Sequence, residues 1–285
     1  MHIPDMMLQG TICPVTTAVA SLGLAGIAYA TYKTKVKPAA SFFAGVTALI
    51  FAAQMANFPI QMGTSGHILG ATLAVALLGS AFGVLAMSLV VITQCLVFAD
   101  GGISVLGANL LNMALLASLP AMIVREYFTT SSFQKTAYFA AAFASTLIAA
   151  TACAVQLAIA GVAPMQSVLP AMLSVHALIG LAEAGLTVAL LVLLSQAIAR
   201  VAPHQAWIMP LGLAVIVALV ISPFAATTPD GLESVAGALG FLHLSDKFFA
   251  TPFAEYTVLT GFVGVVSLFA VAYGTGRVLV RSSER

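Results

Sequence analysis

Charged side chains are scarce in this chain of 285 residues, of which only 7% are charged and 61% are hydrophobic. About a quarter of the residues in an ordinary soluble domain are charged, so the composition excludes a large soluble domain. The formal net charge is +1, from ten Lys and Arg residues against nine Asp and Glu residues. So small an excess of positive charge leaves no basic surface for nucleic acid.

Several signals of other protein classes are missing. The three cysteines, Cys13, Cys95 and Cys153, have no CxxC spacing, which predicts buried free thiols. No Lys or Arg precedes Lys33, so we expect no cleaved signal peptide and a natural start at Met1. No GxxxxGK[ST] sequence occurs, and the chain therefore cannot hydrolyse ATP by itself.

Long apolar segments fill most of the chain. About 20 apolar helical residues cross the hydrocarbon core of a bilayer, which predicts an all-α polytopic membrane bundle of seven spans plus two C-terminal spans. The nine predicted spans are residues 14–32, 39–57, 67–79, 82–98, 109–124, 136–160, 169–199, 205–223 and 256–280. Because the third is short, the third and fourth form either a tight hairpin or one tilted, broken unit.

The chain divides into two predicted regions. Residues 1–200 form a seven-span region, and residues 201–285 form a two-span region around the polar segment 225–255. In this segment, TTPDGLESVAGALGFL predicts a turn followed by a short amphipathic helix.

The basic residues predict the orientation, because loops rich in Lys and Arg stay in the cytoplasm. With the N-terminus outside the cell membrane and the C-terminus in the cytoplasm, nine of the ten basic residues lie inside and only Lys247 lies outside. The nine are Lys33, Lys35, Lys37, Arg125, Lys135, Arg200, Arg277, Arg281 and Arg285. We therefore predict a multi-pass protein of the cell (inner) membrane.

Two of the five histidines, His2 and His67, are predicted at the external end of the spans. A histidine at position two offers three adjacent nitrogens: the amine of Met1, its own amide and its Nδ1. The His67 imidazole adds a fourth, and four nitrogens in a plane suit Ni(II), Cu(II) or borderline Co(II). Thr64 or Ser65 can cap the next helix, which puts His67 in its first turn. The alternative is a disordered His2 and an interfacial His67.

Three stretches resemble signatures of the CbiM/NikM family: MHIPD, FAAQMANFPIQMGTSGHILGATLAVALLG and QCLVFADGGISVLGANLLNM. SVHALIGLAEAGLTVALL in span seven is also similar, and PDGLESVAGALGF resembles the small companion subunit of the same systems. The resemblance therefore covers nearly the whole chain as a fused NikMN-type protein. Members are the substrate-binding membrane components of energy-coupling-factor (ECF) transporters for nickel and cobalt.

The resemblance implies a metal site formed by Met1, His2 and His67, the same set that the chelate argument gives. It also implies Ni(II) or Co(II) as transported substrate, with a membrane coupling (T) subunit and cytoplasmic ABC-type ATPases as partners. The match to the nickel branch is closer. One departure is that Met6 and Met7 follow Asp5 where the family continues with glycine, which redirects the first residues.

Other polar residues have two interpretations each. Asp100, Gly101, Gly102 and Asn109 either bond to the imidazoles or form a turn and cap. His176 and Glu183 share a helix face, and a structural interhelical hydrogen bond is favoured over a role in ligand or proton transfer. His204 is predicted in the cytoplasm, and His243 with Asp246 is either a solvated surface group or a transient stop for the ion.

Two functions other than binding a metal ion for import are possible, and each has less support in the sequence. An ion-coupled secondary transporter usually has several charged groups at the midplane, and here only His176 and Glu183 are available. An intramembrane hydrolase needs HExxH or a nucleophile elbow, and GTSGH is neither. We therefore expect a binding protein and not an enzyme.

Overall fold

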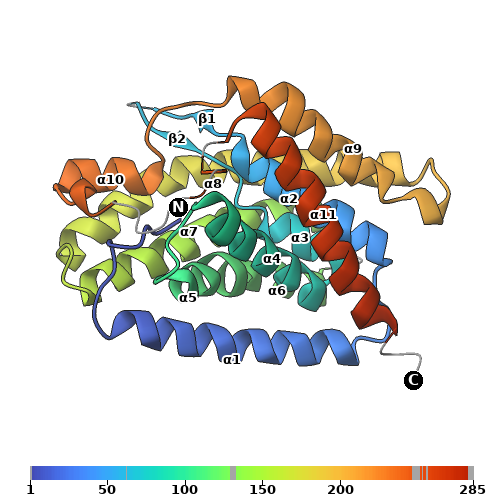
Figure 1. Ribbon diagram of the computed structural model, residues 1–285, viewed down its shortest axis with the longest axis horizontal. Coiled ribbons are helices and arrows are strands. Elements are labelled where there is room, and N and C mark those ends of the chain that lie inside the picture. The colour runs from blue at the N-terminus through green and yellow to red at the C-terminus, as the bar shows by residue number, and fades with distance from the viewer. Residues whose placement is uncertain are drawn as a thin grey trace.

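The computed structural model describes residues 2–61, 63–128, 133–245, 251, 253–254 and 256–281. Met1, Asp246, Lys247 and Arg285, named above, lie outside the described residues. Within the described part, the only strands are β1 (Phe58–Pro59) and β2 (Ser65–Gly66), an antiparallel pair. All the remaining regular structure of that part is helical (Figure 1).

Every predicted span contains a helix. The helices are α1 (Ile12–Lys33), α2 (Ala40–Met55), α3 (Ala71–Leu78), α4 (Ser80–Phe98), α5 (Leu106–Asn109), α6 (Leu119–Tyr127), α7 (Gln134–Ile159), α8 (Met165–Ile198), α9 (Ile208–Ile216), α10 (Gly231–Leu239) and α11 (Val258–Arg281). A π-helical turn (Leu110–Leu115) and a 3₁₀ turn (Leu116–Ser118) join α5 to α6, and further turns extend α9 to 203–224.

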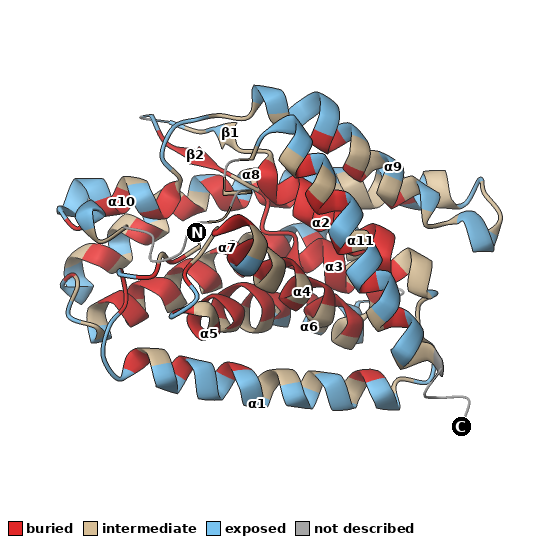
Figure 2. Cartoon of the chain, in the orientation of Figure 1, coloured by how far each residue is buried: buried red, intermediate tan, exposed pale blue. Residues whose placement is uncertain are grey.

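The predicted all-α membrane bundle is confirmed. Seven helices of the described chain are long and apolar enough to cross a membrane. Large apolar side chains are exposed along α1, α8, α9 and α11, where a bilayer would cover them, while most of α3 and α4 is buried (Figure 2). The predicted short helix of segment 225–255 is α10, whose N-terminus has the capping box of Asp230 and Glu233.

The helix α2 is the shortest of the apolar helices near spanning length, with 16 residues, and it is the most enclosed. Thirteen of those residues are buried. Both α9 and α11 pack against it, so the two C-terminal helices cover a helix from the first part of the chain. Its apolar surface is therefore shielded by protein on several sides.

The third predicted span forms the hairpin alternative. Gly79, with φ of 88°, separates α3 from α4, and the two helices pack on each other. Eight residues of helix rise only about 12 Å, so α3 by itself is too short to cross a bilayer. A stretch without regular secondary structure, 67–70, precedes it.

The two ends of the bundle are formed by different segments of the chain. The described N-terminal residues lie near α10 and the β1–β2 pair, whereas α1, α8 and the C-terminal helix α11 end at the opposite side (Figure 1). Lys37 Nζ donates to the Leu279 carbonyl at 2.7 Å, which joins the end of α1 to the end of α11. The histidine end and the lysine end are thus separated by the length of the helices.

Candidate metal site

The first residues of the chain are inserted into the bundle. Ile3 is fully buried, its N–H donates to Asn109 Oδ1 at 2.9 Å, and its carbonyl accepts from Asn109 Nδ2 at 3.1 Å. The N–H of Gly102 donates to the same carbonyl at 2.9 Å. These three bonds fix the backbone beside His2, so the interpretation of His2 as a disordered tail residue is wrong. Asn109 thus acts on the N-terminal backbone and not on an imidazole.

The following residues turn back under the loop 100–105. Asp5 Oδ1 accepts the N–H and the hydroxyl of Ser104, both at 2.9 Å. A side chain at Gly102 would collide with the backbone of Asp5, so glycine is required for this close approach. The departure from the family pattern is accommodated here, because Met7 N–H donates to the Pro4 carbonyl at 3.2 Å and the Met7 side chain is buried.

The prediction that His67 lies in the first turn of a helix capped by Thr64 or Ser65 is wrong. The helix α3 begins only at Ala71, after Gly70 with φ of 84°, and His67 lies in the irregular stretch before it. Glu183 of α8 explains this geometry, because its carboxylate accepts the N–H groups of Leu69 at 2.5 Å and Gly70 at 3.0 Å. The carboxylate replaces the acceptors that a helix would supply.

Thr64 and Ser65 do not cap a helix either. Ser65 N–H donates to the Pro229 carbonyl at 2.8 Å, and Thr64 Oγ1 lies 2.6 Å from the hydroxyl of Ser234. Ala226 N–H also donates to the Asn57 carbonyl at 2.8 Å. Residues 226–234 are therefore bonded along the β1–β2 segment that leads into His67.

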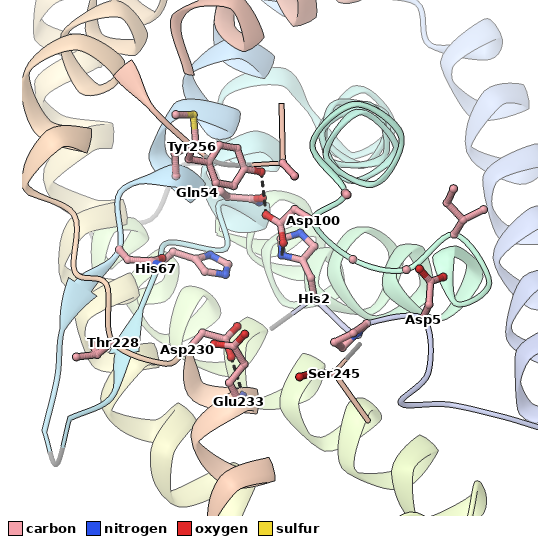
Figure 3. Close-up of a pocket in the computed structure, with 18 residues that line it drawn as sticks. His2, Asp5, Gln54, His67, Asp100, Thr228, Asp230, Glu233, Ser245 and Tyr256 are labelled. Atoms are coloured by element: carbon pink, nitrogen blue, oxygen red, sulfur yellow. Dashed lines mark hydrogen bonds and ion pairs between the residues drawn. The ribbon is translucent and has the colours of Figure 1, made fainter. Parts of the chain in front are cut away.

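The structure brings His2 and His67 together from opposite ends of a 65-residue separation. Their ring centroids are 5.7 Å apart and the rings are nearly parallel, with an interplanar angle of 24°. One ion bonded to both imidazoles through bonds of about 2 Å requires centroids about 4 to 6 Å apart. Both side chains line a pocket of about 260 Å³ (Figure 3).

Hydrogen-bond partners surround both rings. His2 Nε2 lies 3.1 Å from Gln94 Oε1, and His2 Nδ1 lies 3.3 Å from Asp100 Oδ1, so each nitrogen of this ring has an oxygen within reach. His67 Nδ1 lies 3.1 Å from the Ile68 carbonyl, so its proton is on Nδ1 and its Nε2 has ligand character. The predicted chelate uses His2 Nδ1, which leaves Nε2 to donate to Gln94 Oε1. Gln94 was missed by the sequence reasoning, although it lies within the motif QCLVFADGG.

The site favours neutral imidazoles next to an ionised carboxylate. Burial lowers the pKa of His2 and lowers the pKa of His67 to about 4. Burial alone would raise the pKa of Asp100, but the neighbouring His2 and the hydroxyl of Tyr256 hold it below its usual value. Asp100 Oδ1 lies 3.3 Å from His2 Nδ1. Such a set of lone pairs and negative charge suits a cation.

Among the described residues, no three His, Cys, Asp or Glu side chains are close enough to hold a metal ion by themselves. The predicted set also includes the amide of His2 and the amine of Met1. Met1 lies outside the described residues.

The remaining candidates of the sequence are elsewhere. Glu183 makes the predicted structural bonds, but to the irregular stretch before α3 and not to a helix. His176 Nδ1 donates to the Met172 carbonyl of its own helix at 2.7 Å, so an interhelical bond is wrong for this residue. His204 and His243 are exposed. Of the three free cysteines, Cys95 and Cys153 are buried as predicted, and Cys13 is only partly so.

The second part of the chain supplies one wall of the pocket. Thr228, Asp230, Glu233 and Ser245 line one side of it, and Tyr256 lies next to Asp100 (Figure 3). Tyr256 donates a hydrogen bond to Asp100 Oδ2 at 2.8 Å. Sequence reasoning missed this contribution, because PDGLE reads as a turn and cap and no local pattern connects it to His2.

The sequence profile of CbiM, the cobalt uptake substrate-specific transmembrane region, matches residues 2–203. The chain belongs to the CbiM family. A relative from Archaeoglobus fulgidus, fused nickel transport protein NikMN, is 34% identical over 97% of this chain and 98% of its own. The fused NikMN of Rhodobacter capsulatus is 35% identical over 44% of this chain and 36% of its own.

Solved structures agree with membership of the CbiM family. A truncated transition metal transporter covers 69% of this chain and 99% of its own, with a TM-score of 0.61 and 29% identity. The resemblance to the CbiM/NikM family is thus confirmed, and the chain is a multi-pass membrane transport component.

Proposed function

We propose that this chain is the substrate-specificity component of an ATP-driven ECF-type importer of Ni(II) or Co(II). The observation that carries the proposal is the pair of imidazoles of His2 and His67, which face each other in a pocket next to an anchored N-terminal segment. Names of full-length and partial relatives, which mention nickel or cobalt, support the choice of ion. Met1, His2 and His67 are the proposed ligands.

The proposed division of labour follows from the chain's own chemistry. It has no phosphate-binding loop, so the energy must come from a partner ATPase through a membrane coupling subunit. Small residues of α1 such as Ser21, Ala25 and Gly26 are exposed and offer a flat face for such a subunit. In this proposal residues 1–200 bind the ion and residues 201–285 act as the fused companion.

The alternative function of an ion-coupled secondary transporter has less support. It would require ionisable groups that can exchange ions or protons within the membrane. Glu183 has both carboxylate oxygens engaged by backbone N–H groups, and His176 Nδ1 is bonded to its own helix. Neither residue lies in the pocket of about 260 Å³. An intramembrane hydrolase has no supporting observation.

The nickel complex is expected to be yellow and diamagnetic, because four nitrogens including a deprotonated amide give a square-planar field. Purified protein with its natural first residue is titrated with NiCl₂ while absorption and magnetic susceptibility are measured. His67→Ala should leave three nitrogens and weaken binding at least about 10-fold, since a water then takes the fourth position. His204→Ala, which changes an exposed histidine, is the matched control.

A pale green, paramagnetic complex would contradict this ligand set. It would mean that carboxylates or waters, with Asp100 the nearest candidate, hold the ion instead. Binding is also expected to weaken as the pH falls, because amine, amide and imidazole nitrogens take protons back.

The proposed topology has nine crossings, with the pocket on the external side. In a chain whose native cysteines are replaced, a membrane-impermeant thiol reagent should label a cysteine at Ala238 in intact cells and miss one at Lys35. Both positions are exposed, whereas Ser234, which also lies in α10, is half-buried and bonded to Thr64. Labelling of Lys35→Cys alone would show the opposite orientation.

A further inference from the structure

Tyr256 lies beyond the part of the chain that the CbiM profile matches and immediately before α11. Its hydroxyl donates to Asp100 Oδ2 at 2.8 Å, and the other oxygen of Asp100 lies 3.3 Å from His2 Nδ1. We propose that Tyr256 is a positioning residue of the metal site, which acts through Asp100. The inference rests on the proposed function, because it assigns a role in holding the same ion.

The tyrosine ring is held firmly enough for this role. It stacks on Phe98 at the end of α4, with centroids 5.2 Å apart and an interplanar angle of 20°. Phe51 of α2 meets it edge-on at 6.3 Å, and Phe253 packs against Phe98 at 6.3 Å. An aromatic cluster from three parts of the chain therefore fixes where the hydroxyl points.

The orientation of the Asp100 carboxylate is fixed by a residue from another part of the chain. Asp100 follows Ala99, which has a left-handed φ of 50°, and its backbone N–H is bonded to the Gln94 carbonyl at 3.0 Å. The backbone is thus fixed, but the side chain faces a pocket of about 260 Å³ in which it could rotate. The bond from Tyr256 to one oxygen leaves the other oxygen directed at His2.

The position of that oxygen gives it an effect on the ion. Gln94 binds Nε2 of His2, so the carboxylate lies next to Nδ1, the nitrogen that the chelate uses. A carboxylate on this side offsets the charge of a bound dication, and outer partners of this kind change metal affinity about 10- to 100-fold. Tyr256 acts one step further away, so we expect a smaller effect, about 5-fold.

The test is the rate at which nickel leaves the protein. Full-length chain with its natural N-terminus is loaded with NiCl₂ and mixed with excess chelator, and the nickel absorption band is followed in time. Tyr256→Phe keeps the ring that stacks on Phe98 and removes only the hydroxyl, so it should release nickel about 5-fold faster with a shifted band. Tyr273→Phe, a change in α11 away from the pocket, is the control.

A double-mutant cycle separates positioning from a general effect on the fold. If Tyr256 acts through Asp100, Tyr256→Phe has no further effect in a chain that already carries Asp100→Asn. If the Phe variant does not fold, Asp100→Asn alone tests the carboxylate through which Tyr256 acts, and it should release nickel faster than wild type.

Three results would overturn the inference. They are additive effects of the two substitutions, an unchanged rate and band in Tyr256→Phe, and an unchanged rate and band in Asp100→Asn when the Phe variant does not fold. A wild-type chain that binds no nickel contradicts the proposed function itself, and this inference with it.

Discussion

A chain with one extra residue before Met1 is expected to bind Ni(II) more than about 100-fold more weakly than wild type. This loss is larger than the loss of about 10- to 100-fold that follows from removing a residue that only bonds to a ligand. The extra residue turns the terminal amine into an amide with no basic lone pair. The chain cannot slip by one residue to compensate, because Asn109 and Gly102 hold the backbone of Ile3. His2→Ala should have an equally large effect, since it removes an imidazole from the anchored segment.

Isothermal titration with NiCl₂ measures both changes, and a cleavable N-terminal tag provides the best control. Before cleavage the protein should not bind, and after cleavage back to Met1 the same sample should bind. A tag at the C-terminus should leave the affinity unchanged. Wild-type affinity in the uncleaved sample would show that the terminal amine is not a ligand.

The second large effect is expected from Glu183→Leu. This substitution leaves the N–H groups of Leu69 and Gly70 without their acceptor inside the bundle. Each buried N–H without a partner costs about 1–3 kcal/mol, so the folded state should lose about 2–6 kcal/mol. Nickel binding should weaken too, because the stretch that carries His67 loses its support.

Thermal unfolding in detergent, with and without NiCl₂, measures this loss. Glu183→Gln should fall between wild type and Glu183→Leu, because the amide oxygen replaces one acceptor and the NH₂ group faces the second N–H. Glu126→Gln changes an exposed carboxylate in α6 and should be close to wild type. An unfolding temperature and nickel affinity equal to wild type in Glu183→Leu would rule out this role.

The sequence predicts the helices well because apolar length is a local property. Each of the nine predicted spans contains a helix, and the turn and short helix at PDGLE form α10 with its capping box. The chelate argument is equally local, since it needs only a histidine at position two. Its pairing with His67 came from topology, and the 5.7 Å between the rings agrees with it.

The failures have a common physical cause, which is bonding between distant segments. Thr64 and Ser65 look like helix caps, but residues 228–234 compete for them. His67 looks like a first-turn residue, but Glu183, more than a hundred residues later, accepts the N–H groups that a helix would use. Gln94 and Tyr256 carry no local signal. Their roles depend on contacts with residues distant in sequence, which are His2 for Gln94 and Asp100 for Tyr256.

The residues that line the pocket are made at very different times during translation. A ribosome makes His2 first and Tyr256 almost last, so the anchored N-terminal residues exist long before the wall that faces them. Until α11 has been inserted, the pocket lacks the bond from Tyr256 to Asp100 and the aromatic contacts with Phe98. This part of the pocket wall is therefore formed only after nearly all of the chain has been made.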